Sequence, residues 1–496
     1  MPQTNIKHLG IDFGSSSVSV IGYEDIGKEP IVFYDSDLSD TWFATVMTPD
    51  SKKFFQRALT EKNAVDSLKE DIIDGKNTDN VKAFITKLFE TVSKCRNESE
   101  EYDFSNLESI CFGYPTYTPT CTKAYCEKVR DIIKSCLNAF GATDVRIICA
   151  PEPELAAGGY NEANKNVGEY KNAIKDGDLI LVVDLGGYTL DMSILLATKN
   201  AENSISLRPL ANSESIESER MQISMGKRIT GDICFQIYKG DNNSHKPMFD
   251  YNVEQQKCLF FSQNKDNTAP TILKVKSTLP TDPEIEITKF VLAKEQKGDS
   301  LSIEKGKATV TVGIYSSDDG RTIGIGRSFT YCSNIIDNYI NVSLSANRFS
   351  SKRISHVIFT GGTSRIGELR ETIKNKLSQN KFVDPSVKLM YVDRPSEETL
   401  RIRKANDKSE YEKLSSVNVV ALGAAITAAQ EEPADDPNSF FVSGITVDET
   451  KLKCELLSKR NAALEQEILD FCNKEHLCED CQAKLVKLLE DMQYPC

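Results

Sequence analysis

The chain has 496 residues, of which 40% are hydrophobic and 27% are charged, and its formal net charge is −13 at pH 7. This length is too great for one ordinary domain, and the composition is that of a globular protein rather than a fibrous or disordered one. The acidic balance argues against a nucleic-acid backbone or an anionic membrane as the main partner.

Targeting signals and histidine chemistry are also disfavoured. The first ten residues contain no apolar signal core, and no apolar run reaches the length of a membrane span. The 14 cysteines are scattered rather than arranged in the regular framework of small secreted domains, so we expect a reducing cytoplasm. The four histidines, His8, His245, His356 and His476, are far apart in sequence, which disfavours a multi-histidine metal site.

The first expected element is a hairpin in residues 7–25, "KHLGIDFGSSSVSVIGYED". Apolar residues lead to Asp12, Gly14 and three serines follow, and Val18 and Val20 then alternate with polar residues. Alternation with a period of two favours a strand that returns after a turn.

Helices and strands are expected to alternate along the next part of the chain. Apolar residues at helical spacing predict a helix over 78–95, and an apolar run predicts a strand that ends at Pro115. A second amphipathic helix is predicted over 122–142, with Gly141 as its stop signal. Residues 145–160 predict a strand, a turn containing Pro151 and Pro153, and the start of a helix.

A second hairpin is expected in residues 179–197, where the apolar stretch is interrupted by "DLGGYTLD". Asp184-Leu185-Gly186 occupies the place that Asp12-Phe13-Gly14 has in the first hairpin, 172 residues earlier. Matching contexts of this kind indicate an internal duplication, with two lobes that each present one acid-tipped hairpin to a cleft.

The rest of the chain predicts an insertion, a return to the core and a tail. Residues 245–325 are polar and strand-like in pieces, and 356–377 read as a strand, a glycine turn and a helix. Residues 415–430 predict a small-residue helix that packs closely on its neighbours, and 431–439, "EEPADDPNS", have the composition of a linker. From Asp448 onward, leucines and other apolar residues recur every seven positions.

The repeated Asp-x-Gly sequence suggests phosphate and metal chemistry. Glycine lets the backbone approach a bulky anion, and consecutive amide N–H groups can bind phosphate oxygens. A nearby aspartate suits hydrated Mg²⁺. We therefore expect Asp184 to face a metal and Gly186 and Gly187 to face phosphate, while Thr189 and Asp191 project from alternate positions of the outgoing strand.

These motifs resemble the ATPase portion of the seventy-kilodalton heat-shock chaperones (DnaK-like), in the actin and sugar-kinase superfamily. "GIDFGSSSV" is similar to the family's first phosphate motif, "DLGGYTLDMSIL" to the second and "IFTGGTSRI" to its adenosine motif. "PEPELAA" and "VNVVALGAA" resemble the two connecting segments, and "YPTY" resembles the family's relay segment, with Pro115 as the proline that relays nucleotide state. The resemblance covers roughly residues 5–430 and implies an α/β, actin-like fold: two lobes with duplicated mixed β-sheet cores flanked by helices, each with an inserted subdomain.

The resemblance also implies roles for individual residues. Those expected to act in catalysis are Lys69, Glu152, Asp184 and Thr189. Nucleotide would be bound by Gly14, Ser15, Ser16, Ser17, Gly186, Gly187, Tyr188, Glu254, Lys257, Gly361, Gly362, Thr363, Arg365 and Ile366. Asp12 and Asp184 would hold Mg²⁺, largely through water. The ligands that the resemblance implies are ATP or ADP with Mg²⁺, and K⁺ is a further cation that the family uses.

Several positions depart from the family pattern. Tyr188 replaces a glycine of the second phosphate motif, but it keeps the backbone N–H that would face phosphate, so we expect binding with altered turnover. Cys258 replaces an arginine that stacks on adenine, and Phe261 replaces a serine and could stack instead. Val417 stands where the family has an aspartate, so base recognition is less well supported than phosphate recognition.

The domain boundaries follow from these motifs. We expect the first lobe over 1–178 with an inserted subdomain at about 41–104, and the second over 179–412 with an insertion at about 226–322. The remaining segments are a connecting helix over 413–432 that returns to the first lobe, a linker over 433–447 and a helical tail over 448–496. Because only 64 residues of this sequence follow from Pro433, we expect the family's peptide-binding domain to be lacking.

The expected function is a Mg-dependent ATPase switch whose hydrolysis is coupled to lobe closure and to a protein partner or co-chaperone. Two alternatives stay open: a nucleotide-binding regulator with little hydrolysis, and an actin-like filament-forming ATPase; a sugar kinase fits least. Neither nucleic acid nor membrane is expected as a partner, and the tail could mediate self-association. Cys472, His476, Cys478 and Cys481 lie close together, but their helical spacing favours incidental thiols over a zinc site.

Overall fold

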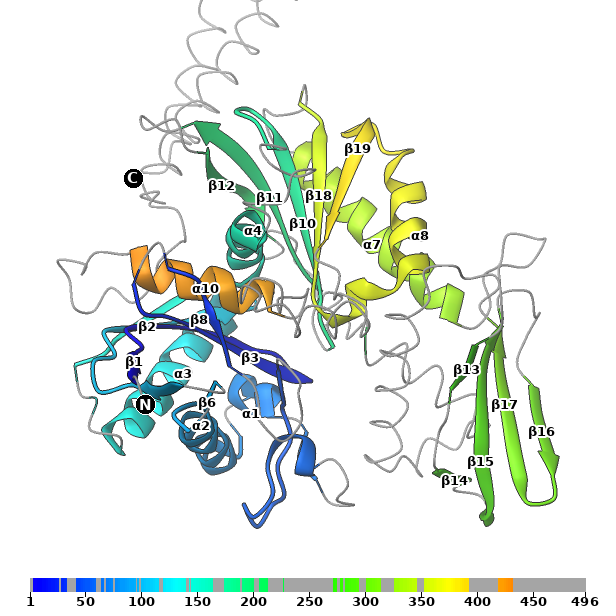
Figure 1. Ribbon diagram of the computed structural model, residues 1–496. Helices are drawn as coiled ribbons and strands as arrows, with labels where there is room; N and C mark the ends of the chain where they lie inside the picture. Colours follow the sequence, from blue (N-terminus) through cyan, green and yellow to red (C-terminus); the bar gives the residue numbers. More distant parts are fainter. Residues whose placement is uncertain are drawn as a thin grey trace, which may run out of the picture. The chain divides into compact units, whose positions relative to one another are not determined.

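The computed structural model describes the two sheets that carry the Asp-x-Gly hairpins and most of the surrounding helices (Figure 1). The described residues are 3–25, 28–33, 42–58, 64–66, 68–74, 76–94, 96–97, 100–115, 119–139, 142, 144–163, 174–187, 190–199, 205–212, 226, 271–273, 277–279, 282–293, 300–313, 325–345, 352–391 and 418–430.

The first mixed sheet has the strand order β4-β3-β2-β8-β9, and β5 pairs with β3 beside this path. Its strands are β2 His8–Phe13, β3 Ser17–Tyr23, β4 Ile31–Val32, β5 Phe43–Ala44, β8 Ser109–Tyr114 and β9 Arg146–Pro151. β2 and β3 form an antiparallel hairpin, while β8 runs parallel to both β2 and β9.

The second mixed sheet has the order β12-β11-β10-β18-β19. Its strands are β10 Leu179–Leu185, β11 Leu190–Lys199, β12 Ile205–Asn212, β18 Ile354–Thr360 and β19 Val383–Tyr391. β10 and β11 form an antiparallel hairpin, and β18 runs parallel to β10 and to β19. The five strands thus repeat the order and directions of the first sheet.

Three helices belong to the first sheet: α1 Leu68–Asp74, α2 Thr78–Val92 and α3 Pro119–Ala139. The buried residues of α2 recur at helical spacing, which gives the helix one apolar face. Every second residue of β2, Leu9, Ile11 and Phe13, enters the same hydrophobic core as this face. The ring of Phe13 packs edge-to-face on Phe84 of α2, with 5.9 Å between centroids.

The second sheet carries helices on both faces (Figure 1): α4 Glu152–Ala163 on one side, and α7 Ile325–Ser345 and α8 Gly367–Leu377 on the other. Because β10 is buried on both faces, it reads as a continuous apolar run interrupted only by Asp184. Asn380, in the turn before β19, donates a 2.7 Å hydrogen bond to Asp337 of α7, and this bond fixes the turn to the helix.

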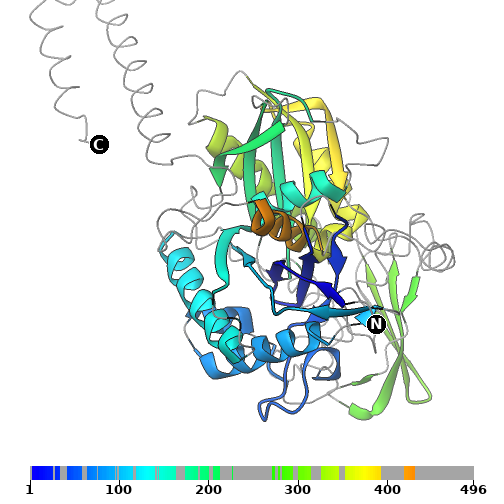
Figure 2. The ribbon, with the colours of Figure 1, turned by 60° about the vertical axis from the view of Figure 1, so that its left-hand side comes forward.

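Helix α10, Val419–Gln430, connects the two sheets. It lies against β2, β3 and β8 of the first sheet and against α4 (Figures 1 and 2). The two helices approach until their backbones touch, because a Cβ on Gly159 would collide with Val419 O and one on Gly423 with Leu155 O. Ser109 of β8 also donates a 2.7 Å hydrogen bond to Ala428 O.

The remaining described elements are two smaller sheets and short 3₁₀ segments. One sheet holds β1 Gln3–Asn5, β6 Arg96–Asn97 and β7 Glu100–Asp103, and the other β13 Thr271–Leu273, β14 Ser277–Leu279, β15 Asp282–Ala293, β16 Ser300–Glu304 and β17 Lys307–Gly313. The 3₁₀ segments are η1 Phe55–Ala58 and η3 Gly362–Arg365. β15 and β17 confirm the strands predicted in the polar region that follows the second hairpin.

Most elements predicted from the sequence are confirmed, with ends that differ from the predicted ones by a few residues. They include both hairpins and helices α2, α3, α8 and α10. One detail is wrong: the sequence predicts a turn with Pro151 and Pro153 between strand and helix, whereas β9 ends at Pro151 and α4 begins at Glu152. Proline fits both places, because the end of a strand and the first helical turn need no backbone donor.

The linker, the tail with its cysteines and His476, and residues 413–417 lie outside the described residues. Within the part of the chain that the structure describes, every helix is too short or too polar to cross a membrane.

Candidate functional site

The two hairpin tips meet. A Cβ built on Gly187, just beyond β10, would collide with the Ser16 hydroxyl between β2 and β3, so the two tips are in contact and a larger residue at 187 would have to displace that hydroxyl. The first tip is held from outside by Thr45, whose hydroxyl donates a 2.7 Å hydrogen bond to Gly14 O and whose amide donates one of 3.2 Å to Ser16 O. Gly14 N also bonds Ser17 O at 3.0 Å, closing the turn.

A buried ion pair lies next to the first tip. Lys69 Nζ, in the first turn of α1, donates a 2.7 Å hydrogen bond to Glu152 Oε1, at the start of α4. The two side chains are only 2% and 4% exposed. An ion pair this deep costs desolvation energy, so its presence calls for a role beyond stability.

Three aspartates complete an acidic cluster. Asp184, near the end of β10, is directly opposite Asp191 on β11, and both are buried. Asp12 occupies the matching position of β2 but faces Ser19 across its hairpin. Asp12 keeps part of its surface exposed. The second hairpin therefore carries two acids where the first carries one.

The electrostatics of this cluster are dominated by burial. Burial raises the pKa of Asp12 to about 6 and that of Glu152 to about 8, with the other acids adding to the rise and Lys69 opposing it. Burial also raises the pKa of Asp184 well above its usual range, reinforced by Glu152, Asp12 and Asp191.

For the pKa of Lys69, burial and the neighbouring charges act in opposite directions. Burial on its own lowers the pKa of Lys69, but the carboxylates of Glu152, Asp191 and Asp12 outweigh this effect and raise it. Four carboxyl groups thus share one ammonium, and the cluster retains at least one proton at neutral pH. A surplus of buried carboxylate is an environment that favours a bound cation.

Within the described residues, no three His, Cys, Asp or Glu side chains are close enough together to hold a metal ion directly. Any cation at this cluster would therefore be bound by fewer carboxylates and by other ligands. Mg²⁺ is commonly held in this way, because it keeps several of its waters.

The adenosine-like motif lies beside Asp184. β18 runs parallel to β10 and ends at Thr360, and Gly361 follows with φ of 80°. A Cβ at Gly361 would lie 2.5 Å from Asp184 Oδ1, so both the left-handed backbone and the close approach require glycine. Thr363 then donates a 3.1 Å hydrogen bond to Gly186 O, which links this motif to the second phosphate motif.

The structure therefore brings together most of the residues that the motifs single out. The residues at or beside the meeting point of the hairpins are Asp12, Gly14, Ser15, Ser16, Ser17, Lys69, Glu152, Asp184, Gly186, Gly187, Gly361, Gly362, Thr363 and Ile366. Tyr188, Thr189, Glu254, Lys257, Cys258, Phe261 and Val417, with the side chain of Arg365, lie outside the described residues, so their roles stay predictions.

Other residues at the site were missed by the sequence reasoning. Gly226 donates a 3.3 Å hydrogen bond to Gly186 O, and the stretch around it carries no motif that would have revealed this. Thr45, which holds the first hairpin tip, and Asn418 were also missed. Asn418 lies just before α10, and its Nδ2 atom donates a 3.3 Å hydrogen bond to Ser19 Oγ of β3. These contacts join segments up to 399 residues apart, and sequence spacing carries no signal for them.

The chain matches no protein-family model, and no curated protein sequence is significantly similar to it.

Proposed function

We propose that this chain is an actin-like, two-lobed ATPase that resembles the ATPase portion of the seventy-kilodalton heat-shock chaperones. The observation that carries the proposal is the buried Lys69–Glu152 pair, which lies with Asp12 and Asp184 where two glycine-containing hairpins meet. A structural core gains little from four acids and one lysine, whereas phosphoryl transfer needs such groups in place.

The repeated strand order supports the actin-like part of the proposal. Both sheets place an antiparallel hairpin beside two parallel strands, and in both the acid is near the end of the first hairpin strand. Duplicated sheets of this kind, joined by α4 and α10, are what the resemblance implies for two lobes around a nucleotide cleft. The close α4–α10 crossing is the natural place for relative motion of the lobes.

Nucleotide binding would follow from the backbone of the two tips. Amide groups around Ser15, Ser16 and Gly187 would donate to the β- and γ-phosphates. The segment from Gly361 to Ile366 would contact adenine and ribose, together with Glu254 and Lys257. Mg²⁺, where bound, would neutralise phosphate charge, and Asp12 and Asp184 would hold its waters.

Hydrolysis would depend mainly on positioning. Water attacks the γ-phosphorus and the bond to the β–γ bridging oxygen breaks, giving ADP and phosphate. Lys69 would stabilise the developing charge, and Glu152 would orient the water; it would accept the proton of that water once bound Mg²⁺ had offset the acid surplus and lowered its pKa. The change in lobe closure would be the output, read by a protein partner in the cytoplasm.

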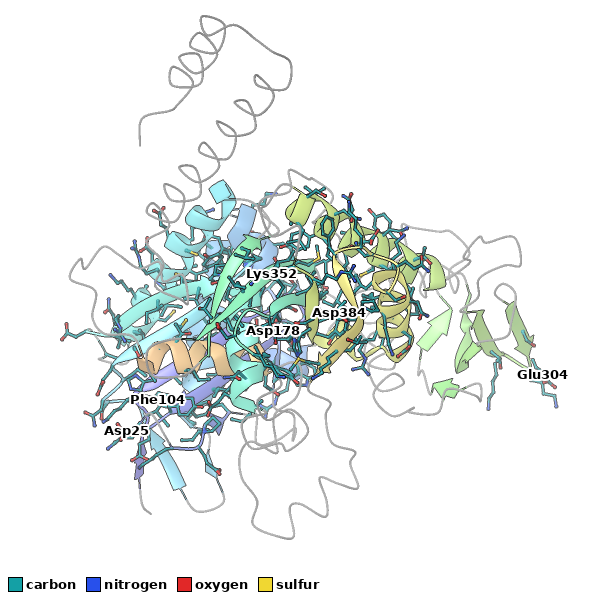
Figure 3. All side chains as sticks on the ribbon, turned by 90° about the horizontal axis from the view of Figure 1, so that it is seen from above. Asp25, Phe104, Asp178, Glu304, Lys352 and Asp384 are labelled. Atoms are coloured by element: carbon teal, nitrogen blue, oxygen red, sulfur yellow. The ribbon has the colours of Figure 1, made fainter. Side chains whose placement is uncertain are left out.

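The test is ATP turnover by the purified chain with Mg²⁺, with Asp12→Asn, Asp184→Asn and Glu152→Ala as variants. We expect steady phosphate release that falls by about 100-fold or more in each variant. Asp25→Asn is the matched control, since Asp25 is a surface residue paired with Lys7 (Figure 3).

The outcomes separate the proposed function from its alternatives. ATP binding without phosphate release would support a regulator instead, and ATP-dependent sedimentation would support a filament. Absence of both binding and turnover would contradict the whole proposal.

A further inference from the structure

Tyr125 of α3 is buried in the core cluster that also contains Phe13, beside Asp12, and Leu68, beside Lys69, although no motif points to it. Helix α3 packs on α1, and Lys128 Nζ donates a 3.3 Å hydrogen bond to Ile72 O. Tyr125 is one helical turn before Lys128, and Lys69 is one turn before Ile72. Tyr125 and Leu68, the chain neighbour of Lys69, are also buried in the same hydrophobic cluster.

The hydroxyl of Tyr125 is unusual in this core. The residue is 2% exposed and packs in the hydrophobic cluster under the first sheet. No described residue makes a hydrogen bond with its Oη atom. Burying an unpaired hydroxyl opposes folding, and phenylalanine would fill the same space without that cost.

The electrostatic surroundings of the phenol link it to two acids of the site. Burial raises the pKa of Tyr125 well above its usual value, and the carboxylates of Glu152 and Asp12 add to the rise. The phenol is therefore within electrostatic range of both acids. It stays protonated at neutral pH and is available as a hydrogen-bond donor.

We propose that Tyr125 is a positioning residue whose hydroxyl donates a hydrogen bond to an oxygen of the Glu152 carboxyl group, directly or through one water, when Lys69 turns toward substrate phosphate. Lys69 is the one side chain shown bonding Glu152 among the described residues, and phosphate would compete for its ammonium. Glu152 would then need another donor to stay oriented. This inference rests on the proposed ATPase function.

The first experiment compares Tyr125→Phe with the wild-type chain. We expect kcat to fall about 10- to 100-fold, the rate equivalent of one hydrogen bond to a charged group, while KM and ATP affinity change little. The nucleotide-free variant should melt at or above the wild-type temperature, because an unpaired buried hydroxyl has been removed.

Tyr339→Phe is the matched control. Tyr339 is a fully buried tyrosine of α7 whose hydroxyl interacts with Ser343, far along the chain from the site. Its loss should lower the melting temperature and leave kcat unchanged, the reverse of the pattern expected for Tyr125.

A double variant tests whether Tyr125 acts through Glu152. Tyr125→Phe combined with Glu152→Gln should be about as slow as Glu152→Gln alone, because the residue to be positioned is no longer a carboxylate. Fully multiplicative effects would overturn the inference.

The remaining outcomes are distinct. If wild-type protein hydrolyses ATP and Tyr125→Phe is equally fast, the inference fails and the proposed function stands. A melting temperature below wild type would show that the hydroxyl is structural, which also overturns the inference. An inactive wild-type protein contradicts the proposed function itself.

Discussion

At the scale of single residues, the site is defined by an imbalance of charge. Among the described residues, Lys69 is the cation that interacts with the four acids Asp12, Glu152, Asp184 and Asp191. Removing the cation leaves acids buried without compensation, whereas removing one acid relieves repulsion. The two partners of the same 2.7 Å ion pair should therefore differ strongly in their importance for stability.

We predict that Lys69→Met lowers the free energy of unfolding by about 3–5 kcal/mol at pH 7, the usual cost of breaking a buried pair. Glu152→Gln should cost far less or stabilise the protein, because its amide oxygen can still accept from Lys69 and the acid surplus falls. Urea denaturation of the nucleotide-free protein measures both values. Equal losses for the two variants would contradict this view of the cluster.

The raised pKa of Glu152 predicts a pH dependence of stability. Its value of about 8 in the folded protein lies above the usual 4.5, so the folded state binds the extra proton between these pH values. The associated stability is fully present below about pH 4.5 and is lost as the pH rises through 8, with a slope of up to about 1.4 kcal/mol per unit.

Unfolding of the nucleotide-free protein at several pH values between 5 and 8 measures this slope. Glu152→Gln should reduce the slope and leave the part that Asp12 and Asp184 contribute, and Glu90→Gln on the exposed side of α2 serves as the control. A slope that is unchanged in Glu152→Gln would show that other groups take up the proton.

At the scale of elements, helix α4 carries two neighbouring glycines where it crosses α10, one packed against α10 and one in open space. Gly159 faces the backbone of α10, where an added Cβ would collide with Val419 O. Gly158 has open space around the position of an added Cβ. Alanine substitutions at the two positions therefore share the same gain in helix propensity and differ only in their effect on the contact between α4 and α10.

We predict that Gly158→Ala stabilises the protein by about 0.5–1 kcal/mol, since alanine favours the helix. Gly159→Ala has the same propensity gain but must push the backbones of α4 and α10 apart, so it should destabilise the protein and weaken nucleotide binding. Denaturation curves and ATP titrations of both variants provide the comparison. Similar behaviour of the two variants would mean that the crossing tolerates separation.

At the scale of the whole molecule, ligand binding should stabilise the fold. Groups from both sheets meet at the site, so a nucleotide held between them would stabilise the assembled state. We predict that Mg·ATP or Mg·ADP at 100 times the dissociation constant adds about 2.7 kcal/mol, seen as a higher melting temperature. Asp12→Asn should reduce the shift. No shift at millimolar nucleotide would contradict nucleotide binding.

The tail is predicted to act in association rather than catalysis. Every phosphate and adenosine motif ends by Gln430, so deletion of residues 433–496 should leave nucleotide binding in place. The seven-residue apolar repeat must be buried somewhere, and its removal should change the oligomeric state or partner capture. Light scattering and an ATP titration test both points, and an unfolded truncated protein would contradict this division of the chain.

The sequence by itself predicted the elements that depend on local pattern. Alternating residues predicted the first hairpin, and apolar strands around a matching Asp-x-Gly sequence predicted the second. Helical spacing predicted α2 and α3, and in α2 the buried residues recur at that spacing. The match between Asp12 and Asp184 predicted a duplication, in agreement with the identical strand orders.

Only the tertiary structure decided which distant residues meet. The pairing of Lys69 with Glu152, the position of Tyr125 and the contact of Ser16 with Gly187 join segments far apart in the chain. The pKa shifts likewise come from burial among several acids, which no residue carries in its own sequence neighbourhood. Local pattern determines elements because each turn or pleat repeats every few residues, whereas a site depends on packing between elements that the chain order does not encode.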